Sequence, residues 1–367
     1  MKNYGWLAII AGAVMLEVLT APGTAINGQS WTVTRSGSPG HVWLRLERAR
    51  PGSRMVNATD VPLANFQGFT ADMLNHSGPA KFEYVQDAGR LICTGRFGWG
   101  RGTGAFTVAL NPAFVADLNR LGYPSPQEDQ LFVLMMSDVD LAYAREIRQA
   151  IPSASLQDLV DLKSRGITLA FIHETAEGNA AALRADDYIA LHDHGVDTGY
   201  IRALKNAGYE LRPADMIELH DHGVNGRFAG ELKQAGYTLP AGDMVRLKDH
   251  GVDSGFVRDL HFLGIHPPAN DIVQLKEHGV SPEYLRRLRE GGLGDARVDD
   301  VVELQQNGVD GNLVVTAHDL GYRFTAPELV DMQHHGVDAA YLRRLHDAGM
   351  QHLSEPQITQ LRMHGVD

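Results

Sequence analysis

A Gly-Val pair recurs at a nearly constant interval along the last two-thirds of the chain. The pairs at Gly195, Gly223 and Gly251 are 28 residues apart, and four later pairs continue with spacings of 28 or 29. A second glycine follows each of the first six pairs by 13 residues, as Gly208 follows Gly195. A fixed period of this length is typical of a stacked array of structural repeats. The sequence therefore predicts an architecture more directly than it predicts a reaction.

Each repeat predicts two short helices joined by glycine turns. In the repeat at 195–222, Tyr200, Ile201 and Leu204 fall on one face of a first helix, and Met216 and Leu219 fall on one face of a second. Glycine after each helix supplies the left-handed residue that ends it. Helices of about nine residues are marginal alone. We therefore expect each repeat to depend on its neighbours, as in an α-solenoid.

Capping residues precede many of these helices. Aspartate or serine can accept a hydrogen bond from the first turn, and a Thr or Ser followed three residues later by Glu or Gln forms a capping box. The predicted caps are Asp197, Asp253, Asp310, Asp338 and Ser281, and the predicted boxes are Thr325 with Glu328 and Ser354 with Gln357.

The helical pattern continues upstream in weaker form. We expect the array to occupy 111–367, with about nine units of which the last is incomplete. The sequence stops at Gly365-Val366-Asp367, where the next helix should begin. Solenoids usually end in a polar capping unit. We expect either that the last single helix serves as this cap or, as the pattern slightly favours, that the chain is a truncated copy of a longer protein.

Residues 26–110 have a different pattern, in which apolar and polar side chains alternate as in strands. Five segments alternate in this way, at 31–34, 42–46, 81–85, 91–95 and 105–109. We expect a small antiparallel sheet of about five strands, as a sandwich or half-barrel, with a long connection at 47–80 that contains a helical turn near 71–74. The glycine-rich segment 98–104 lacks the lysine and long helix of a phosphate loop, so we expect a hairpin. The fold class is thus α+β with two domains.

The N-terminal residues 1–25 resemble a secretory signal. Lys2 precedes an apolar run at 6–16, and small residues at 23–25 could form a cleavage site. The alternative is an uncleaved membrane anchor. Cys93 is the only cysteine, so no internal disulfide forms, and its apolar neighbour predicts a buried strand residue. We expect an exported protein, periplasmic or extracellular.

The formal net charge of −12 argues against nonspecific nucleic-acid binding. Fifteen of the 17 histidines lie beyond residue 110, so any pH response should reside mainly in the repeats. Protonation of all 17 would reverse the sign of the net charge.

Three motifs carry a resemblance to a known family. The segments 82–89 (FEYVQDAG) and 100–107 (GRGTGAFT), with repeats of the form 341–345 (YLRRL), resemble exported bacterial proteins in which a β module precedes short helical repeats. They are also similar to the tails that follow the membrane metallopeptidase domain of Bla-type antibiotic-sensor proteins. The resemblance implies an extracytoplasmic sensor or interaction role. The zinc motif of that peptidase is absent, because Glu177 stands where its second histidine would be in 173–177.

Histidines and cations are the candidate site residues. Histidine recurs before the turn glycine, and the pairs His192/His194 and His220/His222 suggest a metal site. Repeat-equivalent histidines would lie too far apart to share an ion, so we predict helix capping or pH response and no metal or cofactor. The predicted pH-responsive residues are His194, His222, His250, His278 and His335. The predicted partner-binding cations, on the other helix set, are Arg202, Lys205, Arg227, Lys233, Arg258, Arg286, Arg287, Arg343 and Arg344.

Three functions remain open. The first is a non-catalytic exported scaffold that binds a protein or peptide in the bacterial envelope, without nucleic acid and with membrane contact only through an uncleaved N-terminal segment. The second is the sensor or regulatory part of an envelope signalling system. The third is a hydrolase with a site in the β module, although no nucleophile and base stand out in the sequence.

Overall fold

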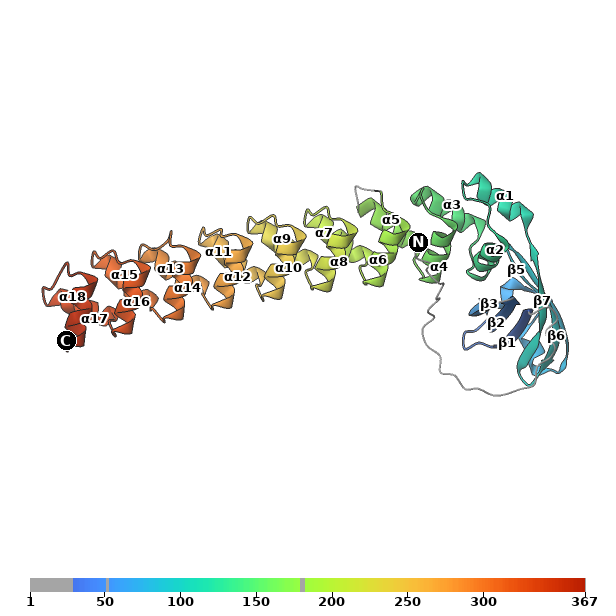
Figure 1. Ribbon diagram of the computed structural model, residues 1–367, viewed down its shortest axis with the longest axis horizontal. Helices are drawn as coiled ribbons and strands as arrows, with labels where there is room; N and C mark the ends of the chain where they lie inside the picture. The colour runs from blue at the N-terminus through green and yellow to red at the C-terminus, as the bar shows by residue number, and fades with distance from the viewer. Residues whose placement is uncertain (1–28, 51–52, 179–181, 367) are drawn as a thin grey trace. The chain divides into compact units, whose positions relative to one another are not determined.

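The computed structural model describes residues 29–50, 53–178 and 182–366. The predicted signal segment 1–25 lies outside these ranges. Within them the chain forms seven strands followed by eighteen α-helices, so the α+β prediction is confirmed (Figure 1). Two compact units result: the sheet unit continues to Arg148 and takes in Ser155–Lys163, and the repeat unit contains 149–154 and the chain from Ser164 onward.

The seven strands form one curled antiparallel sheet in the order β3-β2-β1-β7-β6-β5-β4 (Figure 1). They are β1 (Gln29–Arg35), β2 (His41–Arg50), β3 (Ser53–Pro62), β4 (Phe66–Gln67), β5 (Gly78–Gln86), β6 (Gly89–Gly98) and β7 (Arg101–Leu110). Four helices follow: α1 (Pro112–Arg120), α2 (Glu128–Met136), α3 (Leu141–Ala150) and α4 (Leu156–Ser164). The change from strand to helix thus falls between Leu110 and Pro112, although the sheet unit also includes α1, α2 and most of α3 and α4.

The prediction of about five strands and a long connection at 47–80 was wrong. The sequence pattern missed β3 and β4, and β2 runs on to Arg50. β3 lies at the edge of the sheet and carries Asn57, Thr59 and Asp60, so it lacks the apolar alternation of a strand that is covered on one face. The helical turn expected near 71–74 is confirmed as a 3₁₀ helix, η3 (Ala71–Asn75), which follows the short η2 (Leu63–Asn65).

Aromatic side chains fill the core of the sheet unit. Trp31 is 1% exposed, and its ring meets the Phe82 ring edge-on at 4.8 Å between centroids. The helix α2 covers the same face of the sheet, where the Phe132 ring stacks on Phe106 at 6.3 Å. The buried guanidinium of Arg48 lies 4.7 Å above the centre of the Phe132 ring. The sheet therefore has one buried face and one open face.

The glycine-rich segment is the β6–β7 hairpin, as expected. A Cβ atom at Gly102 would clash with the rings of Phe97 and Trp31, and one at Gly104 would lie 2.0 Å from the Thr94 carbonyl oxygen. Glycine is required here because neighbouring groups approach the backbone closely.

The repeat unit consists of two rows of short helices (Figure 1). The odd-numbered row is α5 (Leu169–Gly178), α7 (Thr198–Asn206), α9 (Gly226–Gln234), α11 (Ser254–Phe262), α13 (Pro282–Glu290), α15 (Gly311–Asp319) and α17 (Ala339–Asp347). The even-numbered row is α6 (Ala185–Asp193), α8 (Pro213–Asp221), α10 (Ala241–Asp249), α12 (Ala269–Glu277), α14 (Val298–Gln306), α16 (Ala326–His334) and α18 (Glu355–Met363). Each helix packs against the next helix of its own row. The predicted α-solenoid is therefore confirmed.

The turns and caps of the repeats follow the sequence. Gly195 and Gly208 have φ values of 73° and 81°, in the left-handed region that the turn requires. The Val196 amide donates to the Leu191 carbonyl at 2.9 Å, which closes the helix end. All the predicted caps and capping boxes form. Local sequence thus sets the length of each helix.

A continuous apolar core runs between the two rows. Repeat-equivalent leucines such as Leu204, Leu232 and Leu260 are at most 1% exposed, and the buried cluster extends from Leu191 to Ile358. Because every repeat fills the same slots, each one buries the apolar faces of the repeats beside it.

Candidate functional site

A row of polar contacts links the C-terminal ends of the even-numbered helices. In three consecutive repeats, the histidine before the turn glycine contacts the carboxylate that precedes the equivalent histidine of the next repeat. The pairs are His194 Nδ1 with Asp221 Oδ2 at 2.8 Å, His222 Nδ1 with Asp249 Oδ1 at 2.9 Å, and His250 Nδ1 with Glu277 Oε1 at 2.6 Å. We call this series the His–carboxylate row. It uses the exposed residues of the repeat to tie one repeat to the next.

Other polar residues occupy the same register on either side of the His–carboxylate row. Upstream, Arg165 Nε lies 3.3 Å from Asp193 Oδ2. Downstream, the Gln306 amide contacts His278 Nδ1 at 2.8 Å, and the next step joins Asn307 to His334 at 3.0 Å. His335 contacts the Asp331 carbonyl and carboxylate within its own repeat instead. Four of the five predicted pH-responsive histidines therefore bridge repeats, and the fifth does not.

The hydrogen bond between His222 and Asp249 alters the pKa of His222. The Asp249 carboxylate accepts a hydrogen bond from His222 and raises the pKa of this histidine above 6.5. The ion pair favours the protonated ring, so its contribution to stability is complete below the unfolded pKa and is lost as the pH rises through the folded pKa. The contact between these repeats should therefore strengthen as the solution is acidified.

The two His-x-His pairs do not converge on one point. The His192 ring lies edge-on to Phe171 at 6.1 Å, and the His220 ring lies edge-on to Tyr200 at 5.1 Å, whereas His194 turns to the next repeat. In the part of the chain that the structure describes, no three His, Cys, Asp or Glu side chains are grouped as the ligands of one metal ion would be.

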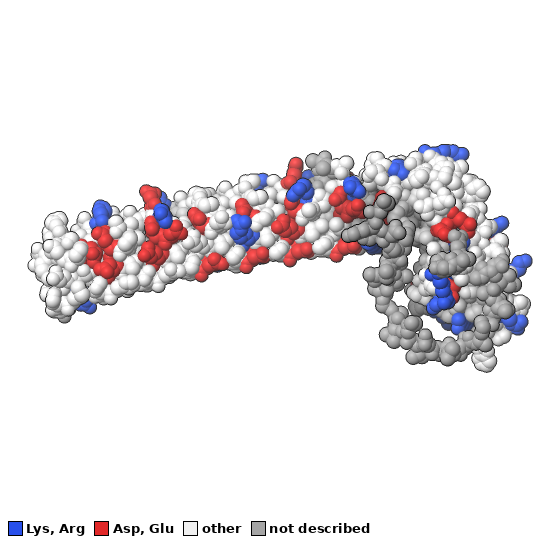
Figure 2. Space-filling view, in the orientation of Figure 1, with Lys and Arg blue, Asp and Glu red and all other residues white. Residues whose placement is uncertain are grey.

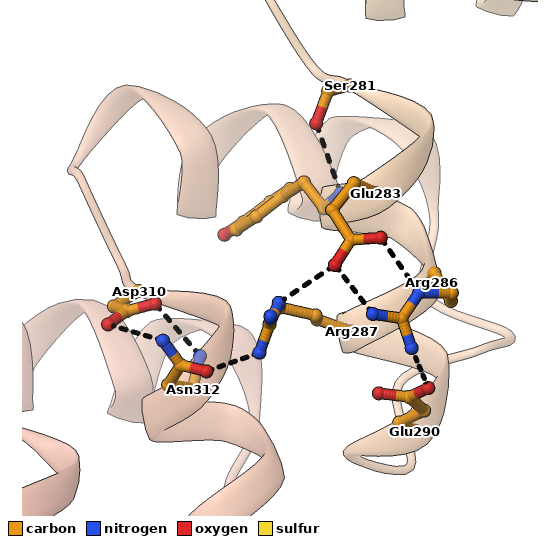
Figure 3. A network of polar contacts seen from close by, with 8 residues as sticks. Ser281, Glu283, Arg286, Arg287, Glu290, Asp310 and Asn312 are labelled. Atoms are coloured by element: carbon orange, nitrogen blue, oxygen red, sulfur yellow. Dashed lines mark hydrogen bonds and ion pairs between the residues drawn. The ribbon is translucent and has the colours of Figure 1, made fainter.

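Many of the predicted partner-binding cations contact carboxylates of the array. Arg202 pairs with Glu174 of the preceding repeat at 3.3 Å, and Arg227 pairs with Glu231 one helical turn later at 2.8 Å. In a second group Arg286 contacts both Glu283 and Glu290, and Arg287 contacts Glu283 and Asn312 (Figure 3). These guanidinium groups are neutralised by adjacent side chains.

Cations late in the odd-numbered helices cap the preceding helix of the row. Lys205 Nζ donates to the Glu177 carbonyl at 2.7 Å, and Lys233 Nζ donates to the Gly208 carbonyl at 2.8 Å. Arg289 donates in the same way to the Leu263 carbonyl. A cation at this position satisfies a free carbonyl and complements the helix dipole.

The remaining three cations, Arg258, Arg343 and Arg344, interact with the array in different ways. Arg343 donates to the Thr316 hydroxyl at 3.1 Å, and the Arg344 guanidinium lies 5.6 Å from the centre of the Tyr341 ring. The pKa of Glu231 is lowered by hydrogen bonds from Ser254 and Arg227, with smaller contributions from the charges of Arg227 and Arg258. Most of the predicted partner-binding cations thus interact with other residues of the array.

Charge is distributed unevenly along the chain. Residues 29–110 contain nine Lys or Arg and five Asp or Glu, whereas residues 111–367 contain 23 and 39. Figure 2 shows Asp and Glu side chains in one patch after another along the repeats, with fewer Lys and Arg side chains between them. In the repeat unit itself, 149–154 and 164–367, 31 Asp or Glu face 19 Lys or Arg, so carboxylates are in excess over cations.

The sheet unit has a pocket that sequence analysis missed. Its volume is about 370 Å³, and the lining is mainly apolar. The lining residues are Met55 of β3, Asp129, Gln130, Val133 and Leu134 of α2, and Leu156, Gln157 and Val160 of α4. No motif marks these residues, because they come from three segments far apart in the sequence. The Asp-His-Gly triplet of the His–carboxylate row, in contrast, recurs at the repeat interval and could have been found.

Comparisons with protein-family models, curated proteins and solved structures returned no match. The resemblance to the tails of Bla-type sensor proteins therefore remains a prediction from sequence motifs. None of the helices in the described residues has the length and apolar character needed to cross a membrane.

Proposed function

We propose that this protein is an exported, non-catalytic scaffold whose repeat unit binds a protein or peptide partner in the bacterial envelope. One observation carries the proposal: consecutive repeats present the same polar chemistry to solvent at a fixed interval, as the carboxylates of the His–carboxylate row illustrate. Extended surfaces of this kind are what solenoids use to bind partners.

The exposed charge favours a basic partner segment. The carboxylates of Asp193, Asp221 and Asp249 remain 49%, 43% and 45% exposed, although each contacts a side chain of the preceding repeat. Asp and Glu also outnumber Lys and Arg in the repeats. Complementary charge across an interface speeds encounter and selects among partners. Binding should therefore weaken as the salt concentration rises.

Affinity capture from bacterial envelope extract tests this function. A triple variant, Asp193→Asn, Asp221→Asn and Asp249→Asn, removes three charges but keeps a hydrogen-bond acceptor at each site. The matched control neutralises three carboxylates of the sheet unit: Asp72→Asn, Glu83→Gln and Asp117→Asn. We expect one protein to be captured reproducibly by the wild type and the control, and at least tenfold less by the triple variant.

Two results would contradict the proposal. One is that no protein is captured reproducibly. The other is enzymatic turnover by the purified protein in peptidase or glycosidase assays, if it disappears on substitution of a polar residue of the sheet-unit pocket, because the hydrolase alternative would then account for the protein.

A further inference from the structure

Within the described residues, β3, one of the two outer strands of the sheet, is paired along one edge only. β3 pairs along its whole length with β2, in a continuous antiparallel register from Arg50↔Ser53 to His41↔Pro62. No other strand within the described residues pairs with its opposite edge. Natural edge strands are commonly short, bulged or interrupted by proline. β3 is ten residues long without a bulge, and its proline is the last residue.

The apolar pocket adjoins the buried face of this strand. Met55 lies opposite Arg48, whose side chain is buried, and Val56 lies opposite Glu47 on the other face of the sheet. Met55 is 37% exposed and forms one wall of the pocket, with Val133 of α2 and Val160 of α4 on the other walls. A strand added beside β3 would direct every second side chain to this face.

Two buried side-chain oxygens on β3 accept no hydrogen bond from the part of the chain that the structure describes. The Asn57 Oδ1 and Asp60 Oδ1 atoms have almost no exposed surface and no hydrogen-bond partner among the described residues. Buried polar atoms without a partner are uncommon in native proteins. Asn57 lies opposite Leu46 and Asp60 opposite Trp43, so the two residues belong to opposite faces of the strand. The polar side chains of β3 are therefore not fully satisfied by hydrogen bonds within the described residues.

We propose that β3 and the adjoining pocket bind an extended segment of another protein, which adds to the sheet as a further strand. The N–H and C=O groups of an extended backbone have the same spacing as those along the edge of a strand, so the two can form hydrogen bonds with each other. The pocket selects apolar residues at alternate positions of that segment. Asp129, the charged residue of its lining, is paired with Arg48 at 3.3 Å, so ionic attraction contributes little to the selection.

A designed peptide tests the proposal on the full-length protein. The probe is a capped ten-residue peptide of alternating leucine and threonine with a lysine added at each end. Its counterpart has the same side chains but is methylated on four consecutive central backbone nitrogens. We expect the first peptide to bind and to slow hydrogen exchange of the amides of β3. We expect the methylated peptide to bind at least tenfold more weakly, because it cannot donate backbone hydrogen bonds.

A pair of adjacent substitutions separates the pocket from the rest of the strand. Met55→Lys places a charge in the pocket and should weaken binding of the probe at least tenfold. Val56→Lys, on the opposite face and 46% exposed, is the matched control and should change binding by no more than about twofold. Val160→Gln tests the opposite wall of the pocket without altering β3. Circular dichroism confirms that each variant is folded.

Several outcomes would overturn the proposal. The first is that the methylated peptide binds as tightly as the unmethylated probe. The second is that the Met55→Lys and Val160→Gln variants bind the probe as tightly as the wild type. The third is that the bound probe does not slow hydrogen exchange of the amides of β3. A concentration-dependent dimer that protects β3 without any peptide would show that a second copy of the chain is the occupant. The triple variant of the His–carboxylate row should bind the probe normally, so this test is independent of partner binding by the repeat unit.

Discussion

Trp31 in the sheet unit and Leu247 in the repeat unit are both almost fully buried, but their neighbours come from different parts of the sequence. The indole N–H of Trp31 donates to the carbonyls of Thr94 and Ala105, which are 63 and 74 residues away. Leu247 occupies a slot that Leu219 and Leu275 occupy in the adjacent repeats. Loss of Trp31 should therefore affect the whole sheet, whereas loss of Leu247 should remain local along the array.

The largest effect is expected from Trp31→Ala. Removal of a fully buried aromatic side chain costs about 3–5 kcal/mol. Cys93 on β6 reports the result, because burial raises the pKa of its thiol to about 12 and it is the only cysteine in the chain. At pH 8 the wild-type thiol should resist a disulfide reagent, and the variant should react much faster. Equal reactivity would show that Trp31 does not maintain the core around Cys93.

The difference between the two regions also limits what the sequence can predict. Helix lengths, caps and turn glycines of the repeats follow from local patterns such as Asp197 before a helix and Gly208 after it, and each pattern is confirmed several times by repetition. No repeated sequence pattern indicates the strand β3. Although β3 pairs with β2 from Arg50↔Ser53 onward, its polar residues Asn57, Thr59 and Asp60 interrupt the apolar alternation by which a strand is recognised in the sequence.

The candidate site residues could likewise be predicted only in part from the sequence. The histidines and cations of the array could be identified from the sequence, but the side chains and carbonyl groups that they contact could not. The contact between His222 and Asp249 depends on the offset between neighbouring repeats, which the sequence does not state. The pocket between Met55, Val133 and Val160 could not be predicted, because it forms only when β3, α2 and α4 come together.

Two glycine substitutions, one in the sheet unit and one in the repeat unit, should destabilise the protein less than Trp31→Ala. Gly104→Ala places a methyl group against the Thr94 carbonyl across the β6–β7 pair and should destabilise the sheet unit by about 1–3 kcal/mol. Gly251→Ala, at φ 70° with open space around it, should cost about 1 kcal/mol from backbone strain alone. Chemical denaturation followed by circular dichroism measures both. A larger loss for Gly251→Ala would reverse the expected order.

The smallest effect concerns the His–carboxylate row. By NMR, His222 should titrate above pH 6.5, because the Asp249 carboxylate stabilises its protonated form. Asp249→Asn keeps an acceptor but removes the charge, so the midpoint should fall toward the ordinary histidine value. The ion pair strengthens the contact between repeats on the acidic side of the titration and is lost on the alkaline side. A midpoint that the substitution leaves unchanged would show that Asp249 has no influence on His222.

Native-state hydrogen exchange of Leu247→Ala tests most directly the claim that each repeat is stabilised by the repeats beside it. Truncation of a buried leucine costs about 2–5 kcal/mol. We expect protection to fall most in α10, less in the neighbouring α8 and α12, and progressively less in helices farther along the array. An equal loss of protection in every helix of the repeat unit would contradict the claim.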